Sequence, residues 1–308
     1  MKLRRAEDLR PGVLYRATVL RKQGMHPRVL ASSALIRPLP ELLARADGPP
    51  SLHVLASAVQ STVAVGAVIS HETAAELLGF PLPRKLTRAG GARLHCRREQ
   101  RGTGYSSARL VVHTGRTAAT IRFRGLRLSS PVSALLEVAP QLGHGDLVAC
   151  IDALVGGKCH VPAVSLDELR GASASWRGPQ GRALRRALAD ARDRVWSPME
   201  TRLRLLLLAQ GFPEPEPNVE VRDPATNQRF YLDLAYPQWC IAIEYDSEEH
   251  RTDRAQWQKD LHKNEVLHHL GWTVLRVSVA DVRSPSALRR RLAAAIVVAV
   301  DKEAAKAL

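Results

Sequence analysis

The sequence predicts a protein of the α/β class, which is α+β when the whole chain is considered. A mixed α+β N-terminal region precedes a C-terminal domain built on a central mixed sheet. Two observations support this prediction. Residues 92–128 alternate apolar and polar side chains in short runs separated by glycine, which is typical of strands. After residue 197, helical and strand-like segments follow one another with clear start and stop signals. The chain has 308 residues, which suffices for two domains.

The C-terminal domain is predicted to begin with a helix over residues 197–211. Ser197 is a favourable N-cap, Pro198 suits the first helical position, and Gly211 suits the end. The predicted order is helix, three strands, helix, strand, helix. We expect the last strand to pair in parallel, because it follows a crossover helix. The elements after the first helix are strands at 218–224, 230–237 and 240–246, a helix at 253–270, a strand at 273–279 and a helix from 284.

The N-terminal region is less regular. Residues 59–70 read either as a strand or as a buried helix, and Ser70 is expected to cap a helix that ends at Gly79. Helices return at Ser130, which precedes a proline. Residues 171–181 read as a loop. We therefore expect two domains, residues 1–196 and 197–308.

Charge separates the two predicted domains. Residues 1–196 hold 30 Lys and Arg against 14 Asp and Glu, whereas residues 197–308 hold 15 against 16. A region with a net charge of +16 favours a polyanionic partner, most simply nucleic acid and double-stranded DNA in particular. The alternative is a solvated basic surface without such a partner.

Cysteines and apolar runs indicate the compartment. The four cysteines are scattered with no CxxC pair, which argues against a disulfide framework and suits a reducing cytoplasm. No apolar signal core follows the charged N-terminus. Residues 292–300 form an uncharged apolar stretch, much shorter than the roughly 20 residues of a membrane span. We expect this stretch to form a buried helix face, and we expect no membrane partner.

Three carboxylates lie inside apolar runs. Asp233 is in the middle of one predicted strand, and Glu244 and Asp246 are two apart in the next, so they should share a face. Charges inside apolar strands are costly unless they are paired or bound to a metal. The pattern predicts a site for a hard divalent cation. The alternative for Asp233 is a structural pair with an arginine such as Arg276.

The C-terminal motifs resemble those of a known superfamily. The landmarks are SPMETRLRLLL, VRDP, YLDLAYP, IEYDSEEHRTDRAQWQKDLHK and LGWTVLRV, in that order. Residues 197–281 resemble the domain related to very-short-patch-repair endonucleases, within the PD-(D/E)XK nuclease superfamily. The region upstream, with ISHETAAELLGFPLP, VHTGR and FRGLRLSSPVSALLEVA, is similar to abortive-infection-type antitoxins of actinobacteria. Such proteins usually begin with a winged helix, which residues 1–50 match poorly.

The resemblance implies a restriction-endonuclease-like αβββαβ core that carries a metal-dependent nuclease site. It implies that Asp233 and Glu244 bind Mg²⁺ or Mn²⁺, and that Asp246 completes the metal shell or orients the attacking water. His250 would act as general base or acid. Glu200 is either a catalytic acid of the first helix or the end of a capping box that Ser197 begins.

Two departures from the superfamily pattern bear on catalysis. The position of the third-strand lysine is occupied by Asp246, so Lys259 or Lys263 on the following helix would have to supply the cation. Ser247 stands where relatives carry glycine. The scattered cysteines also do not form the zinc site of the repair enzymes. No metal-ligand spacing links His71, His113, His144 and His160, which we expect to be structural or exposed.

These observations favour a metal-dependent DNA endonuclease that hydrolyses phosphodiester bonds. The alternative is a non-catalytic, DNA-binding regulator of the antitoxin type on a nuclease-like scaffold, which the missing third-strand lysine favours. A nuclease or toxin directed at RNA is a third hypothesis. The sequence leaves open both a partner toxin and the oligomeric state.

Overall fold

The computed structural model describes residues 3–98, 105–115, 119–177, 180–246 and 254–306, with side chains described for all of these except 105–106, 254–260, 303 and 306. By its internal contacts the chain forms two compact units. The N-terminal unit comprises Met1–Gly143 and Cys159–Arg186, and the C-terminal unit comprises His144–Lys158 and Ala187–Leu308. This division differs from the single boundary expected before Ser197.

The N-terminal unit opens with a small antiparallel sheet. Its three strands lie in the order β1-β3-β2, and Leu9, Leu20 and Leu43 are buried in a common core beside the helices. Residues 6–45 form, in order, a 3-10 helix, a strand, two helices and two strands, and every element is short. The elements are η1 (Ala6–Asp8), β1 (Tyr15–Arg16), α1 (Ala17–Lys22), α2 (Pro27–Leu30), β2 (Leu35–Leu39) and β3 (Leu42–Arg45).

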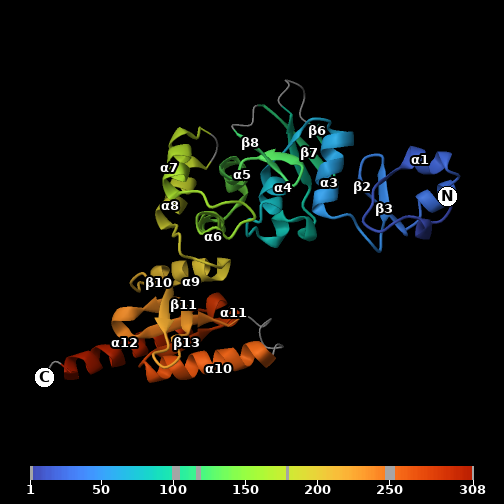
Figure 1. Cartoon of the computed structure of the whole chain (residues 1–308). Coiled ribbons are helices and arrows are strands. Elements are labelled where there is room, and N and C mark those ends of the chain that lie inside the picture. The colour runs from blue at the N-terminus through green and yellow to red at the C-terminus, as the bar shows by residue number, and fades with distance from the viewer. Residues whose placement is uncertain (1–2, 99–104, 116–118, 178–179, 247–253, 307–308) are drawn as a thin grey trace. The chain divides into compact units, whose positions relative to one another are not determined.

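A six-stranded mixed sheet forms the main part of the N-terminal unit (Figure 1). Its strand order is β6-β7-β5-β4-β9-β8, which confirms the strands predicted between residues 92 and 128. The strands are β4 (Val68–Ile69), β5 (Leu94–Arg98), β6 (Tyr105–Ser106), β7 (Leu110–Thr114), β8 (Thr120–Phe123) and β9 (Leu126–Ser129).

Helices surround this sheet and follow it in the chain. Residues 59–70 hold both predicted alternatives, since Val59–Val63 is a π-helical turn and Val68–Ile69 is a strand. Ser130 caps its helix as expected, but the Ser70 side chain makes no cap hydrogen bond. The elements are α3 (Leu52–Ala58), η2 (Val59–Val63), α4 (His71–Leu77), η3 (Arg84–Leu86), η4 (Arg88–Gly90), α5 (Pro131–Val138), η5 (Ala139–Gln141), α7 (Leu166–Ser175) and α8 (Gly181–Asp190), of which residues from Ala187 onward belong to the C-terminal unit.

The C-terminal unit has the predicted order of elements around a four-stranded mixed sheet. The strand order is β10-β11-β12-β13, with antiparallel pairing through β12 and parallel pairing of β12 with β13, as the crossover helix predicted. The elements are α6 (His144–Val155), α9 (Pro198–Ala209), β10 (Glu216–Arg222), β11 (Arg229–Tyr236), η6 (Pro237–Trp239), β12 (Ile241–Tyr245), α10 (Arg254–His269), β13 (Thr273–Val277), α11 (Val279–Arg283) and α12 (Ser286–Lys306).

Apolar side chains cover both faces of this sheet. On one face, residues of α9 and α12 such as Leu207 and Leu292 pack with Leu234 and Ile243. On the other face, Leu267 of α10 packs in a separate cluster with neighbours from β10, β11 and β12. α9 and α10 therefore lie on opposite faces, and each can bring polar side chains to the strand ends.

The apolar stretch of residues 292–300 was expected to form a buried face of the last helix. One side of it packs against the core through Leu292, Ala295 and Ile296, and the other side is exposed. Leu292 is fully buried, whereas Val297 and Val298 are 59% and 53% exposed. The stretch carries apolar residues at consecutive positions, so some of them must point away from the sheet whichever face is packed. Among the described residues, no helix combines the length and apolarity needed to cross a bilayer.

Candidate active site

Two of the predicted acids face each other on adjacent strands. β11 and β12 pair antiparallel with Leu234 opposite Ile243, and one further step of this register places Asp233 opposite Glu244. Opposed residues of an antiparallel pair share one face of the sheet. Oδ2 of Asp233 also accepts a hydrogen bond from the backbone N–H of Tyr245 at 2.9 Å. The predicted convergence of these two carboxylates is thus present.

Lys263 of α10 contacts one of these two carboxylates. Nζ of Lys263 lies 2.6 Å from Oε2 of Glu244 and donates to the backbone carbonyl of Tyr231 at 2.7 Å. The two charged side chains are largely buried, with 18% and 20% of their surfaces exposed. Oε1 of Glu244 is buried and has no hydrogen-bond partner among the described residues. One oxygen of Glu244 is therefore neutralised and the other is available for a ligand.

The electrostatics follow from burial and like charge. Burial raises the pKa of the Glu244 carboxyl, and the neighbouring Asp233 carboxylate raises it further, while Lys263 opposes both effects. Buried carboxylates that repel each other are stabilised by a cation placed between them. Carboxylate oxygens are the ligands that Mg²⁺ prefers. Asp233 and Glu244 therefore fit a hard divalent cation.

Glu200 approaches the same region from α9. Oε2 of its buried carboxylate accepts from the Trp196 backbone N–H at 2.9 Å and from Nδ2 of Asn218 at 2.6 Å. Burial raises the pKa of Glu200, and the charge of Asp233 adds to the increase. Ser197 caps the helix by accepting from the Glu200 backbone N–H. The Ser197 half of the predicted capping box is present, whereas the Glu200 carboxylate accepts from the backbone of Trp196 and from Asn218 on the sheet.

Asn218 connects Glu200 to the sheet row. It lies opposite Asp233 in the register of β10 and β11, between the paired residues Pro217 and Val219. Its φ of 49° belongs to the left-handed region, which asparagine tolerates better than most residues. It was not singled out from the sequence, since a lone asparagine in a strand carries no signal for a site.

The remaining predicted residues are less well placed. β12 ends at Tyr245, so Asp246 lies just beyond it, where its backbone N–H donates to the Val277 carbonyl at 2.9 Å. Asp246 does not join Asp233 and Glu244 in a set of carboxylates whose ligand atoms all lie within 4.8 Å of one another. Strand alternation could not place it, because the strand stops first. His250 and Ser247 lie outside the described residues, as does the side chain of Lys259 on α10.

Arg276, the arginine considered as a structural partner of Asp233, lies on β13. It is opposite Glu244 in the parallel pairing of β12 with β13, so it is one strand further from Asp233. The row across the sheet is therefore Asn218, Asp233, Glu244 and Arg276. The register of the four strands aligns these residues across the sheet.

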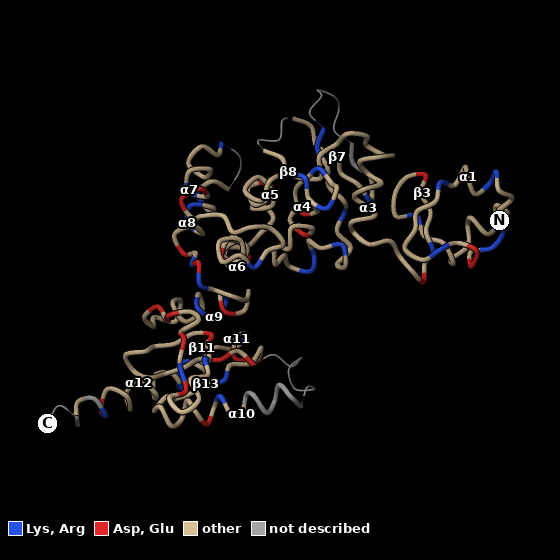
Figure 2. The backbone as a smooth tube through the Cα atoms, viewed as in Figure 1, with Lys and Arg blue, Asp and Glu red and all other residues tan. Residues whose placement is uncertain are grey.

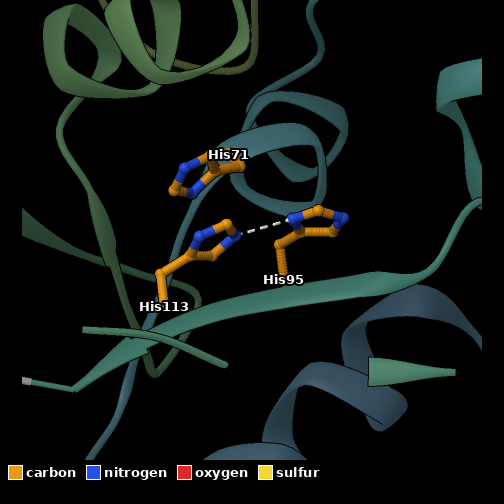
Figure 3. A group of neighbouring side chains, drawn as sticks. All are labelled: His71, His95 and His113. Carbon is orange, nitrogen blue, oxygen red and sulfur yellow. Dashed lines mark hydrogen bonds between the residues drawn. The ribbon is translucent and has the colours of Figure 1, made fainter. Parts of the chain in front are cut away.

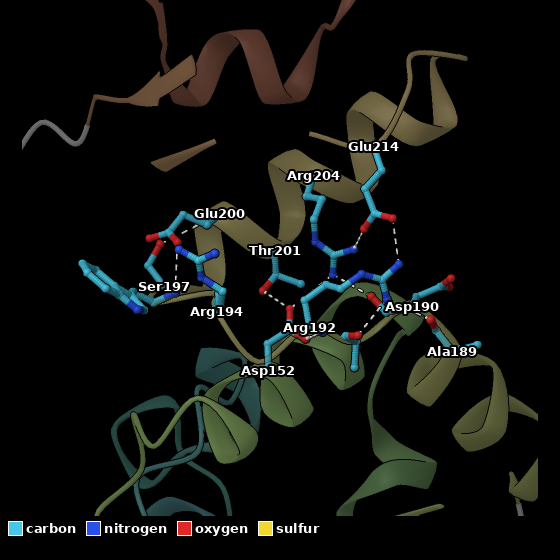
Figure 4. Close-up of polar contacts among 12 residues, drawn as sticks. Asp152, Ala189, Asp190, Arg192, Arg194, Ser197, Glu200, Thr201, Arg204 and Glu214 are labelled. Atoms are coloured by element: carbon cyan, nitrogen blue, oxygen red, sulfur yellow. Dashed lines mark hydrogen bonds and ion pairs between the residues drawn. The ribbon is translucent and has the colours of Figure 1, made fainter. Parts of the chain in front are cut away.

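A buried ionic cluster holds α9 in place. Arg204 is fully buried, and its guanidinium contacts Oδ2 of Asp152 at 3.3 Å and Oε1 of Glu214 at 2.8 Å (Figure 4). Oδ2 of Asp152 also accepts from the Thr201 hydroxyl at 2.8 Å. Asp152 lies on α6, which explains why α6 belongs to the C-terminal unit. Because Arg204 is one helical turn after Glu200, this cluster also fixes the position of Glu200.

Comparisons with known proteins identify relatives without an assigned activity. No family model matches the chain. Two proteins of Mycobacterium tuberculosis, uncharacterized protein MT2308 of strain CDC 1551 / Oshkosh and uncharacterized protein Rv2248 of strain ATCC 25618 / H37Rv, are each 32% identical over 187 residues. The match covers 60% of this chain and 67% of each relative. The chain belongs to the same family as these two proteins.

A solved structure gives a weaker likeness. The crystal structure of the RV2827C protein from Mycobacterium tuberculosis aligns with 73% of this chain and 87% of its own, at 17% identity and a TM-score of 0.35. A likeness at this level carries no argument about the site.

Proposed function

We propose that the C-terminal unit is a metal-dependent endonuclease that hydrolyses phosphodiester bonds in DNA. The observation that carries this proposal is the contact of Lys263 with Glu244 beside Asp233. A carboxylate pair with an adjacent ammonium group is the set of charges that superfamily nucleases use. Here the lysine comes from α10. The site therefore has a positively charged side chain even though Asp246 occupies the position of the third-strand lysine.

The residues have distinct roles in this proposal. Asp233 and Oε1 of Glu244 would hold Mg²⁺ or Mn²⁺, which would polarise a phosphate oxygen and activate a water molecule. Lys263 neutralises Glu244 and places positive charge where the scissile phosphate gains negative charge. Glu200 positions the row through its hydrogen bond with Asn218. Asp246 and His250 keep the roles that the resemblance implies, as predictions.

The basic N-terminal unit suits the proposed substrate. Lys and Arg occur at many positions along it (Figure 2). Several are exposed on or near the six-stranded sheet, among them Arg84, Arg98, Arg109, Arg122 and Arg124. Contacts of this kind bind phosphates irrespective of base sequence.

Plasmid cleavage tests the proposal. Purified protein should nick or linearise supercoiled plasmid with Mg²⁺ or Mn²⁺, and Asp233→Asn or Glu244→Gln should lower the rate by about 10²–10³-fold. Glu216→Gln is the matched control, because Glu216 is an exposed carboxylate on the same sheet. Equal residual rates in the wild type, Asp233→Asn and Glu216→Gln would assign the cleavage to a contaminant or to another site.

Asp246 in the third-strand position is the observation that favours a non-catalytic regulator. Such a regulator would bind DNA equally well with Mg²⁺ and with EDTA, and Glu244→Gln would leave its affinity unchanged. Calorimetric titration of duplex DNA under both conditions separates the two functions. Competition between DNA and RNA in the same cleavage assay tests the third hypothesis.

A further inference from the structure

Three histidines that no sequence spacing connects meet on the six-stranded sheet of the N-terminal unit (Figure 3). His71 is the first residue of α4, His95 is on β5 and His113 is on β7. One ligand atom from each lies within 4.8 Å of the others. Among the described residues, this is the only set of three or more His, Cys, Asp or Glu with that property. The sequence spacing of His71 and His113 gave no sign that the two side chains lie together.

The spacing of the ring nitrogens suits a small cation. Nδ1 of His95 lies 3.0 Å from Nε2 of His113, and the His71 and His113 rings stack with centroids 3.7 Å apart. Zinc binds histidine nitrogen at about 2.0–2.1 Å in tetrahedral geometry, which places two ligand nitrogens roughly 3.3 Å apart. Because the His71 and His113 rings stack at an interplanar angle of 9°, at least one of them would rotate to bring all three nitrogens onto one ion.

Two carboxylates flank the histidines. Glu72 is only 7% exposed, and its Oε2 lies 3.2 Å from Nδ1 of His95 without a hydrogen-bond partner among the described residues. Glu137 accepts from the His71 backbone N–H at 2.9 Å and from Arg97 at 3.2 Å. A buried carboxylate oxygen without a hydrogen bond is costly. A divalent cation beside it would offset that cost.

The protonation state of the rings is compatible with ligation. Burial lowers the pKa of His71 to about 2 and those of His95 and His113 to about 4, with the neighbouring rings adding to the effect for His71 and His113. Neutral imidazole is the form that binds metals. The three rings would therefore bind a cation at neutral pH without first losing a proton.

We propose that His71, His95 and His113 form a site for one zinc ion, with Glu72 and Glu137 as flanking carboxylates. Imidazole ligands favour Zn²⁺ and similar transition metals, whereas Mg²⁺ prefers oxygen. The ion would join α4 to β5 and β7 and so connect the helix to the sheet. This site is separate from the proposed nuclease site and does not depend on it.

Metal content and cobalt spectroscopy test the site in the full-length chain. Protein incubated with Zn²⁺ and desalted should retain one equivalent, His113→Asn and His95→Asn should lose it, and the control His53→Asn should keep it. His53 is in the same unit but outside the cluster. Glu244→Gln should also keep it, which separates this site from the proposed nuclease site. Co²⁺ should give visible d–d bands without a thiolate charge-transfer band, because no cysteine belongs to the set.

A thermal-shift measurement tests zinc binding even if one of the histidine variants does not fold. Zn²⁺ should raise the Tm of the wild type and of His53→Asn, because a ligand that binds only the folded state stabilises it, and Mg²⁺ should not give this shift. Circular dichroism shows which variants fold. The proposal is overturned if folded wild type retains no zinc, or if folded His113→Asn and His95→Asn retain as much as His53→Asn.

Discussion

Each unit contains a buried acid that contacts a cation, but only the N-terminal unit also gathers three buried histidines among its described residues. In the C-terminal unit, buried acids contact cations, as Asp152 contacts Arg204 and Glu244 contacts Lys263. In the N-terminal unit, burial holds three histidines in the neutral form, and the nearby Arg97 is directed to Glu137. The first arrangement keeps charge and neutralises it, whereas the second suppresses charge. The first therefore suits hard cations and phosphates, and the second suits a metal that binds neutral nitrogen.

Removal of a buried cation should produce the largest effect on stability. Arg204→Met leaves Asp152 and Glu214 without their shared partner, and loss of one member of a buried ion pair costs about 3–5 kcal/mol. Urea unfolding monitored by circular dichroism measures the change. Arg202→Met is the matched control, because Arg202 pairs with Asp146 while 39% exposed, and such pairs contribute at most about 1 kcal/mol. Similar losses in both variants would contradict the special role of Arg204.

The stability of the metal-free protein should decrease at acidic pH because its buried histidines are neutral. The pKa of His95 in the folded protein is about 4, below its ordinary value of 6.5, so the unfolded chain binds a proton first as the pH falls. Metal-free protein should therefore lose stability between about pH 6.5 and pH 4. One pKa unit corresponds to about 1.4 kcal/mol, so His95 should account for a few kcal/mol of this loss.

The comparison of variants isolates that contribution. In EDTA, His95→Asn should show a shallower dependence of unfolding free energy on pH than the wild type, whereas His53→Asn should keep the wild-type dependence. A series of urea titrations from pH 7 to pH 4 provides the data. Parallel curves for all three proteins would show that His95 is protonated equally in both states.

Loss of the lysine in the proposed nuclease site should lower activity more than stability. Lys263→Met removes the positive charge from Glu244, and we expect the cleavage rate to fall by about 10²-fold, as for other charge-stabilising groups. Lys302→Met is the control, since Lys302 is exposed on α12. Plasmid cleavage and Tm measured on the same samples separate catalysis from folding. An unchanged rate in Lys263→Met would leave the lysine without a catalytic role.

The smallest effect is expected from exposed charges. Arg109→Ala combined with Arg122→Ala should weaken DNA binding several-fold and reduce the slope of log K against log salt by about 0.9 for each phosphate that the variant no longer neutralises. Arg170→Ala should change neither quantity, because Arg170 is exposed but already pairs with Asp167 at 2.9 Å. Fluorescence anisotropy over a range of salt concentrations measures both. Equal slopes of log K against log salt in the double variant and the wild type would show that Arg109 and Arg122 do not contact the DNA.

The sequence predicted the C-terminal unit better than the N-terminal unit for a physical reason. Ser197, Gly211 and Gly271 mark element ends through local backbone preferences, and the apolar runs between them are long enough to show their period. Residues 6–45 lack such runs, because their strands have two to five residues and α2 has four. Residues 59–70 change from a helical turn to a strand within twelve positions, so no single period describes them.

Local pattern by itself determined that Asp233 and Glu244 lie in apolar strands, that Ser197 caps the helix bearing Glu200, and that the last strand pairs in parallel. The first two features depend on alternation along one segment and on backbone preferences, and the third depends on the crossover helix before the strand. Only the tertiary structure decided that Lys263 contacts Glu244, that α6 packs with α9 through Asp152 and Arg204, and that His71, His95 and His113 meet. Each of these contacts joins segments far apart in the chain, and their positions depend on strand register and on the packing of helices against sheets, which no local pattern encodes.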